Sequence, residues 1–129
     1  MSGHEGRTAD DMVYGMELVM DIDHCARLII SDRDDLEAFA IGMVETIGMR
    51  AYGEPILAHF GHDDPVTSGW TLVQLIETSS IVAHFSESLR RAHINVFSCR
   101  RFDVDAAIKY ARGFLGLPDA VVTHTVIYR

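Results

Sequence analysis

The segment IETSSIVAH, from Ile76 to His84, places three hydroxyl residues in a row between two apolar stretches. Ser79 is followed five residues later by His84, and Cys99 comes twenty residues after Ser79. A serine beside a histidine can act as nucleophile and base, but a hydrolase of this kind also needs a third group that orients the histidine. The sequence has no G-x-S-x-G turn. A serine in a strand is more often simply hydrogen-bonded, so the spacing alone favours a structural role.

Two helices are predicted from apolar side chains that recur at helical spacing. The first begins at a cap on Ser31 or Asp32 and ends at Gly48, and the second begins at Asp103 and ends at Gly116-Leu117-Pro118. The apolar positions that should form the core are Leu36, Phe39, Met43, Ile47, Ile108 and Leu115.

Six strands are expected around these helices, in residues 13–22, 49–60, 70–78, 80–85, 92–99 and 120–128. The second of them should bend near Gly53 and Pro55. This order predicts an α+β fold, a two-layer sandwich with a mainly antiparallel sheet and two helices on one face. We expect residues 1–12 to form a disordered tail and residues 13–129 to form a single domain.

The amino-acid composition restricts the kinds of partner that the protein can bind. The formal net charge is −8, with 19 acidic and 11 basic side chains, which argues against nucleic-acid binding and favours a small cationic ligand. Cys25 and Cys99 are expected to be free thiols, as is usual in the cytosol. The N-terminal residues carry no apolar segment of a signal peptide, and no apolar run approaches the roughly 18 residues that span a membrane. We therefore expect a cytoplasmic protein.

The spacing around Ser79 resembles the self-processing core of the short bacterial and archaeal S-adenosylmethionine decarboxylases. In that family a strand runs into Glu-Ser-His, a second His follows the Ser by five residues, and Thr-Cys-Gly ends a later strand. Here TSSIVAH keeps Ser79 and His84, and NVFSC supplies Cys99 without a gap. TSGWT matches the family's Gly-Val-Ser turn and places Thr71 at its processing serine. The resemblance extends from Tyr14 to the C-terminus.

This resemblance implies self-cleavage between Thr78 and Ser79. The Ser79 hydroxyl would attack the Thr78 carbonyl in an N-to-O acyl shift assisted by Thr71 and His84, and elimination would leave a pyruvoyl group at residue 79. That group would form a Schiff base with the substrate amine and act as the electron sink for decarboxylation. Cys99 would return a proton to the α-carbon. The implied function is an adenosylmethionine decarboxylase of polyamine (spermidine) synthesis.

The residues implied for substrate binding differ in part from the family pattern. Asp21 stands where the family has Glu and is expected to bind a cationic substrate, S-adenosylmethionine or a related amino acid. Glu87 lies one position from the family's ribose-binding Glu. Further departures are found at Pro65, Thr78, Ser80 and Arg100. They keep open an alternative, a homologue that binds an amino-acid or nucleoside ligand or a partner without cleaving.

Two further expectations concern assembly and metals. Strands 70–85 leave few polar residues for the face of a single sheet, so we expect a homodimer, as in the resembling family. HFGHDD brings His59 and His62 close to two aspartates, which is compatible with a metal-binding protein. A solvated polar loop is the simpler interpretation, because His-x-x-His outside a helix is a weak signal, and we predict no metal.

Overall fold

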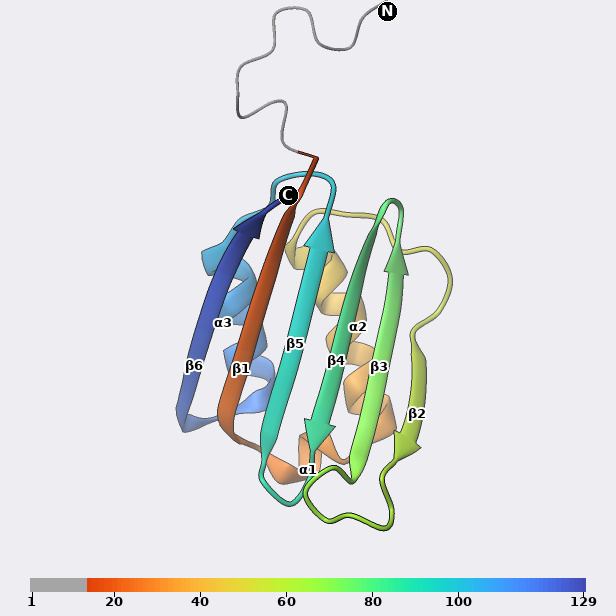
Figure 1. The fold of residues 1–129 in the computed structure, drawn as a ribbon, viewed down its shortest axis with the longest axis vertical. Coiled ribbons are helices and arrows are strands. Elements are labelled where there is room, and N and C mark those ends of the chain that lie inside the picture. The colour runs from red at the N-terminus through yellow and green to blue at the C-terminus, as the bar shows by residue number, and fades with distance from the viewer. Residues whose placement is uncertain (1–13) are drawn as a thin grey trace, which may run out of the picture.

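The structure, a computed structural model, describes residues 14–129. The expected tail at residues 1–12 and the first residue of the expected first strand, Val13, lie outside the described residues. Figure 1 shows a single layer of strands with the helices behind it.

The sheet has six strands, and all neighbouring strands run antiparallel. Their spatial order is β2-β3-β4-β5-β1-β6, so the first strand of the chain lies between the last two. The strands are β1 (Met16–Cys25), β2 (Ile56–Phe60), β3 (Gly69–Ile76), β4 (Ser79–Ser86), β5 (Arg91–Ser98) and β6 (Gly116–Tyr128).

The helices all cover one face of this sheet (Figure 1). They are α1 (Arg27–Ile30), α2 (Arg33–Thr46) and α3 (Val104–Leu115). The predicted α+β two-layer sandwich is therefore confirmed. The four-residue α1 was not predicted, because a single helical turn is too short to produce a periodic pattern of apolar residues.

Both long helices begin at aspartate caps. The Asp32 carboxylate accepts a hydrogen bond from the Asp35 amide, and the Asp103 carboxylate accepts one from the Ala106 amide. Each cap satisfies an N–H group that has no partner inside the helix. Helix α2 ends before Gly48, whose φ of +69° lies in the left-handed region that glycine adopts at little cost.

The core lies between the helices and the sheet. Alternate residues of the strands point into it, and five of the six predicted core residues are buried there: Leu36, Phe39, Met43, Ile47 and Leu115. The sixth, Ile108, is only partly buried and packs against the edge of the core, which corrects that prediction. The residue before it, Ala107, is fully buried instead, so the buried stripe of α3 is centred one position earlier.

Several strand boundaries differ from the prediction. The strand expected at residues 49–60 is present as β2 only from Ile56, because Gly53 and Pro55 interrupt the strand rather than bend it. The polar run at residues 77–80 was expected inside or between strands, but Glu77 and Thr78 form a two-residue turn and Ser79 begins β4. Strand β1 extends to Cys25 rather than ending at Ile22. Strand β6 begins directly after α3, because the backbone of Gly116 is already extended, with φ −93° and ψ 150°.

The other face of the sheet is not covered by a helix, and we call it the open face. Large apolar side chains are exposed on it, one or two from each of four strands: Val19, Ile56, Phe60, Leu75, Val121 and Ile127. The aromatic rings of Tyr14 and Phe97 stack there as well, with centroids 6.1 Å apart. None of the helices in residues 14–129 is long and apolar enough to cross a membrane.

Candidate active site

The turn between β3 and β4 carries backbone strain. Thr78 has φ +58°, in the left-handed region, and a β-branched residue adopts that region only at a cost of about 1–3 kcal/mol. Its hydroxyl donates a hydrogen bond of 2.6 Å to the carbonyl oxygen of Glu77. The peptide bond from Thr78 to Ser79, at which the sequence predicted cleavage, is therefore next to a strained residue.

Cys99 lies beside this turn. Ser79 pairs with Ser98 of β5, so that Cys99 follows just past the end of β5. Its Sγ is 2.5 Å from the hydroxyl oxygen of Thr78. Ser79 and Cys99, which are twenty positions apart in the sequence, are thus brought to the same corner of the sheet.

The Ser79 hydroxyl is unusual in its surroundings. Its oxygen is buried and has no hydrogen-bond partner among the described residues. Ser79 shares the helix-covered side of β4 with Ile81 and Ala83, which are fully buried. A buried polar atom without a partner costs free energy, so its presence next to a strained turn marks a candidate functional residue.

The two cysteines differ in reactivity. The Cys25 thiol is buried and donates to the carbonyl oxygen of Ile22 at 3.5 Å. Burial, with a smaller contribution from the Asp23 carboxylate, raises the pKa of Cys25 to about 12. Because the thiolate is the reactive form, Cys25 is chemically inert. Cys99, which is partly exposed, is the cysteine that can take part in chemistry.

Four polar side chains form a row across the open face, which we call the polar row: Thr71, His84, His93 and Asp21. They are direct cross-strand neighbours on β3, β4, β5 and β1. The Thr71 hydroxyl is 3.1 Å from Nδ1 of His84. At the other end of the row, Nδ1 of His93 is 2.8 Å from a carboxylate oxygen of Asp21. Each imidazole therefore has one nitrogen fixed by a neighbouring oxygen.

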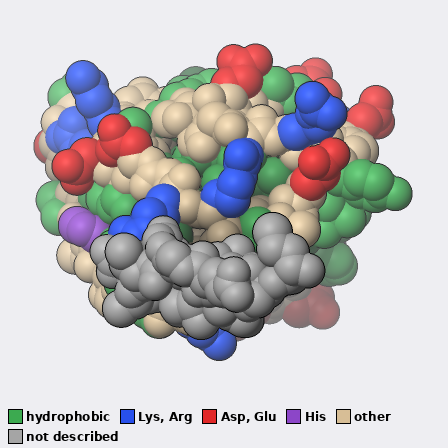
Figure 2. All heavy atoms as spheres, turned by 90° about the horizontal axis from the view of Figure 1, so that it is seen from above, with side chains coloured by type: hydrophobic (Ala, Val, Ile, Leu, Met, Phe, Trp, Pro, Cys, Tyr) green, Lys and Arg blue, Asp and Glu red, His purple; other side chains and the backbone are tan. Residues whose placement is uncertain are grey.

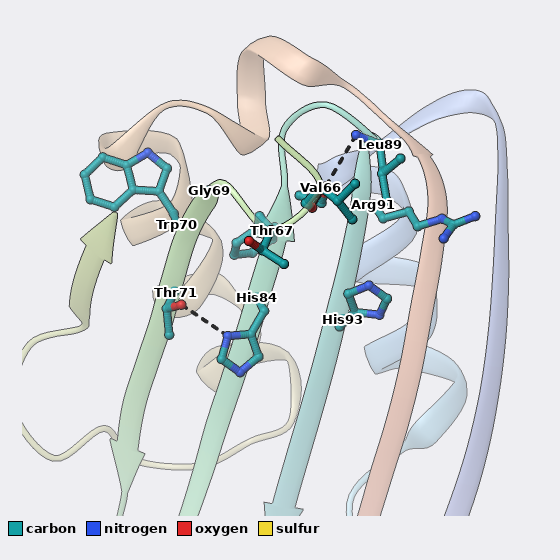
Figure 3. A pocket seen from close by; sticks show the side chains of 11 residues that line it. Val66, Thr67, Gly69, Trp70, Thr71, His84, Leu89, Arg91 and His93 are labelled. Atoms are coloured by element: carbon teal, nitrogen blue, oxygen red, sulfur yellow. Dashed lines mark hydrogen bonds between the residues drawn. The ribbon is translucent and has the colours of Figure 1, made fainter. Parts of the chain in front are cut away.

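A cavity of about 420 Å³ lies over the two histidines. Figure 3 shows His84 and His93 below it, with Val66, Thr67 and Leu89 along its rim. A smaller cavity of about 160 Å³ adjoins it, and both histidines line the two cavities. The smaller one is also lined by Asp21 and by the apolar side chains of Val19 and Val82. The polar row therefore borders a space that a small molecule can enter.

The polar row and the β3–β4 turn are separated within one chain. Ser79 and His84 lie five residues apart on the same strand, and a strand rises about 3.3 Å per residue, so their backbones are about 16 Å apart. The four residues predicted to be catalytic thus form two pairs. Thr71 and His84 form one pair, and Ser79 and Cys99 lie in the other region.

The residues predicted to bind substrate also lie in two places. Asp21 belongs to the polar row and has His93 as its partner. Glu87 forms an ion pair with His59, with 2.7 Å between Oε1 and Nε2. Partial burial works to raise the pKa of Glu87, but the hydrogen bond from His59, with contributions from Ser31 and Arg27, outweighs it and lowers the pKa.

HFGHDD does not gather into a metal site. The His59 ring stacks on His62, with centroids 4.7 Å apart, and meets Trp70 edge-on. Within residues 14–129, no group of three or more histidine, cysteine or acidic side chains is arranged to hold a metal ion. His59 is instead bound to Glu87.

A third cavity, of about 420 Å³, lies beside the β3–β4 turn. It is lined in part by Arg50, Arg100 and Glu77. Figure 2 looks onto this end of the molecule and shows basic and acidic side chains interspersed there. The space next to the turn is therefore polar and charged, whereas the cavity over the histidines has a more apolar rim.

Sequence reasoning did not single out His93 as a functional residue. The alternation of β5 places His93 on the same face as Asn95 and Phe97. That it lies between His84 and Asp21 depends on how β4, β5 and β1 are paired, and β1 is more than sixty residues away in the sequence. Only the register of the sheet reveals the polar row.

The sequence profile of one protein family, S-adenosylmethionine decarboxylase, matches residues 16–126. Among solved structures, the fold is similar to the crystal structure of the adenosylmethionine decarboxylase from Aquifex aeolicus VF5. The TM-score is 0.73 and the sequence identity 18%, over 91% of each chain. None of the curated proteins that were compared matches the chain. The span matched by the profile contains both the β3–β4 turn and the polar row.

Proposed function

Because this chain belongs to the S-adenosylmethionine decarboxylase family, we propose that it is a pyruvoyl-dependent decarboxylase that cleaves itself between Thr78 and Ser79. The observation that carries this proposal is the left-handed backbone of Thr78, with Cys99 against its side chain. Strain next to the bond that must break favours the step, because cleavage releases the strain. The unpartnered Ser79 hydroxyl supplies the nucleophile.

The proposed cleavage uses only the chain and water. The Ser79 oxygen bonds to the carbonyl carbon of Thr78, the C–N bond between the two residues breaks, and the hydroxyl proton ends on the freed nitrogen. Elimination at residue 79 then removes its α-proton and releases residues 1–78 as a carboxylate. Water then displaces the nitrogen of residue 79, which leaves as ammonia. A pyruvoyl group remains at that residue. This group supplies a carbonyl that accepts electrons as carbon dioxide leaves a bound amino acid.

For the substrate we propose S-adenosylmethionine or a related cationic amino acid, in polyamine synthesis in the cytoplasm. The charge of the open face supports a cation, since β1 presents the Asp21 carboxylate there without an arginine partner. Cys99 is the candidate proton donor to the product, because it is the reactive thiol beside residue 79.

A homodimer would bring together the two parts of the site, the polar row and the β3–β4 turn. A group that moves a proton must come within about 3 Å of it, and His84 lies about 16 Å along β4 from Ser79 in the same chain. If two open faces pack together with their ends reversed, the polar row of one copy lies over the turn of the other. The exposed apolar side chains of the open face support such packing.

One observation favours the alternative, a homologue that binds a ligand without cleaving. The Ser79 side chain lies on the helix-covered side of β4, whereas His84 points to the open face. For cleavage the Ser79 side chain must turn toward the Thr78 carbonyl, and for binding alone it need not.

Intact-mass spectrometry of the purified chain separates the two functions. Cleavage yields two chains, residues 1–78 and 79–129, and the smaller one carries a keto group that reacts with a carbonyl reagent. Ser79→Ala should give one uncut chain, because the nucleophile is gone. Ser80→Ala is the matched control, since it removes the neighbouring hydroxyl and should leave cleavage in place. A wild-type chain that stays uncut after long incubation contradicts the proposal and favours the binding homologue.

A further inference from the structure

On the open face of β1, Asp21 has a different kind of ion-pair partner from its acidic neighbours Glu17 and Asp23. The Glu17 carboxylate is held by Arg129 at 2.9 Å, and the Asp23 carboxylate by Arg91 at 2.5 Å. Asp21 has only the imidazole of His93, at 2.8 Å. Among the acidic side chains that β1 presents on this face in the described chain, Asp21 is therefore the one whose charge no arginine neutralises. On this face of β1, Asp21 is therefore the carboxylate best placed to attract a cation.

The hydrogen bond to Asp21 also fixes the chemistry of the His93 ring. A neutral imidazole that donates from Nδ1 to a carboxylate carries its lone pair on Nε2. In this neutral form, donation from Nδ1 to Asp21 leaves Nε2 of His93 as a hydrogen-bond acceptor with a negative charge behind it. This combination recognises a positively charged N–H donor.

The position of His93 gives such a donor room to bind. His93 lines both the cavity of about 420 Å³ and the adjoining one of about 160 Å³, and Figure 3 shows its ring at the floor of the larger cavity. The apolar side chains of Val19 and Val82 line the smaller cavity. A small ammonium ion with a short apolar chain matches these surroundings, because its head meets an acceptor and its chain meets apolar walls.

We propose that His93 and Asp21 form a recognition site for a primary ammonium group, with Nε2 of His93 as the contact atom and Asp21 as its positioning residue. This deepens the proposed function, on which it rests for its biological meaning, because a decarboxylase of this family takes an amine-bearing substrate. It also changes the role of Asp21, which the sequence predicted to contact the cation directly. Asp21 instead acts through His93.

Three probes of nearly equal size but different charge test whether the site prefers a cation. They are n-butylammonium, 1-butanol and butyrate, and they are titrated into the full-length Ser79→Ala chain while the ¹⁵N resonances of the histidine side chains are followed by NMR. Butylammonium should shift His93 Nε2 in a saturable way, and butanol should not. Shifts caused by butyrate rather than butylammonium would overturn the proposal, because they would show that Nε2 carries a proton and binds anions.

Substitutions then assign the contact. His93→Ala should weaken butylammonium binding by about ten-fold or more, as expected for a hydrogen bond to a charged group, and His93→Gln should restore part of it through its amide oxygen. Thr123→Ala is the matched control, since Thr123 is exposed and pairs with Asp21 on the opposite side from His93, and it should bind like the parent chain. Equal binding by His93→Ala and the parent chain would overturn the proposal.

A spectroscopic measurement distinguishes a positioning role of Asp21 from a purely structural one. In the parent chain the ¹⁵N shifts of the neutral form of His93 should show its proton on Nδ1. Asp21→Ala should remove this preference and weaken binding, and Asp21→Asn should keep it in part, because the amide oxygen still accepts from Nδ1. An unchanged His93 tautomer in Asp21→Ala would overturn the positioning role. All arms use an uncut chain, so their outcome is independent of whether the wild-type chain cleaves itself.

Discussion

Along β1, successive side chains enter two different environments. Leu18, Met20 and Ile22 point to the helix-covered face and are at most 1% exposed. Glu17 and Asp21, which alternate with them, point to the open face and bind polar partners on β5 and at the C-terminus. The same strand thus supplies the core on one side and the polar row on the other.

The difference between the two faces separates stability from chemistry. Burial of apolar side chains on the helix-covered face stabilises the fold, and the hydrogen-bonded histidines of the open face add little to it because both are exposed to solvent. Ser79 is the exception, since its hydroxyl is a polar group on the apolar side. Substitutions on the two faces should therefore have distinct consequences.

The largest effect on stability is expected on the helix-covered face. Phe39→Ala should lower the free energy of unfolding by about 3–5 kcal/mol, because it removes a fully buried ring and leaves a cavity. Ile41→Ala, on the same helix but 49% exposed, is the control and should cost far less. Urea unfolding of both variants measures the difference. Similar losses for the two variants would contradict the assignment of the buried face.

The next effect concerns assembly through the open face. Val19→Lys should convert a dimer into a monomer at micromolar concentration, because it places a charge on the open face, which is the proposed interface. Leu28→Lys, at an exposed position on α1, should leave the dimer intact. Sedimentation velocity distinguishes the two. A monomeric wild-type chain, or a Val19→Lys dimer as stable as wild type, would show that the open face is not the interface.

A smaller loss is expected at a helix cap that lies away from both faces. Asp103→Ala should reduce the free energy of unfolding by about 1 kcal/mol, since the Ala106 amide loses its acceptor. Asp103→Asn should recover most of it, because its amide oxygen can still accept. Denaturant midpoints of the three chains provide the test, and an alanine variant as stable as wild type would speak against the cap.

The smallest effect depends on pH and concerns the pair of Glu87 and His59. The pKa of Glu87 is lowered in the folded chain, so its ionised form stabilises the fold above the pKa of an unfolded glutamate, and this contribution disappears as the pH falls through the lower folded value. Glu87→Gln should therefore be less stable than wild type above about pH 5 and equal to it in stronger acid. Parallel stability curves from neutral to acidic pH would contradict the interaction.

Much of the fold followed from local patterns in the sequence. The spacing of Leu36, Phe39 and Met43 and the caps at Asp32 and Asp103 located both long helices. The family and the sandwich fold were also predicted correctly from the residues around Ser79.

The candidate site was less predictable, because its geometry is set by strand pairing. Ser79 and His84 are close in the sequence, but an extended strand holds them about 16 Å apart. His93 and Asp21 are seventy-two residues apart in the sequence, and only the register of β1 and β5 brings them together. The positive φ of Thr78 could not be foreseen either, because a threonine does not normally adopt it.

The central claim is that one copy's polar row serves the cleavage turn of another copy, and mixed dimers test it directly. Ser79→Ala cannot cleave but keeps His84, and His84→Ala keeps Ser79 but should not cleave as a homodimer. When the two chains are co-expressed with different tags and the mixed dimer is isolated, intact-mass spectrometry should show that the His84→Ala chain is cut after residue 78 and the Ser79→Ala chain is intact. A His84→Ala chain that stays uncut in the mixed dimer, while the wild-type chain paired with Ser79→Ala is cut, would contradict the account.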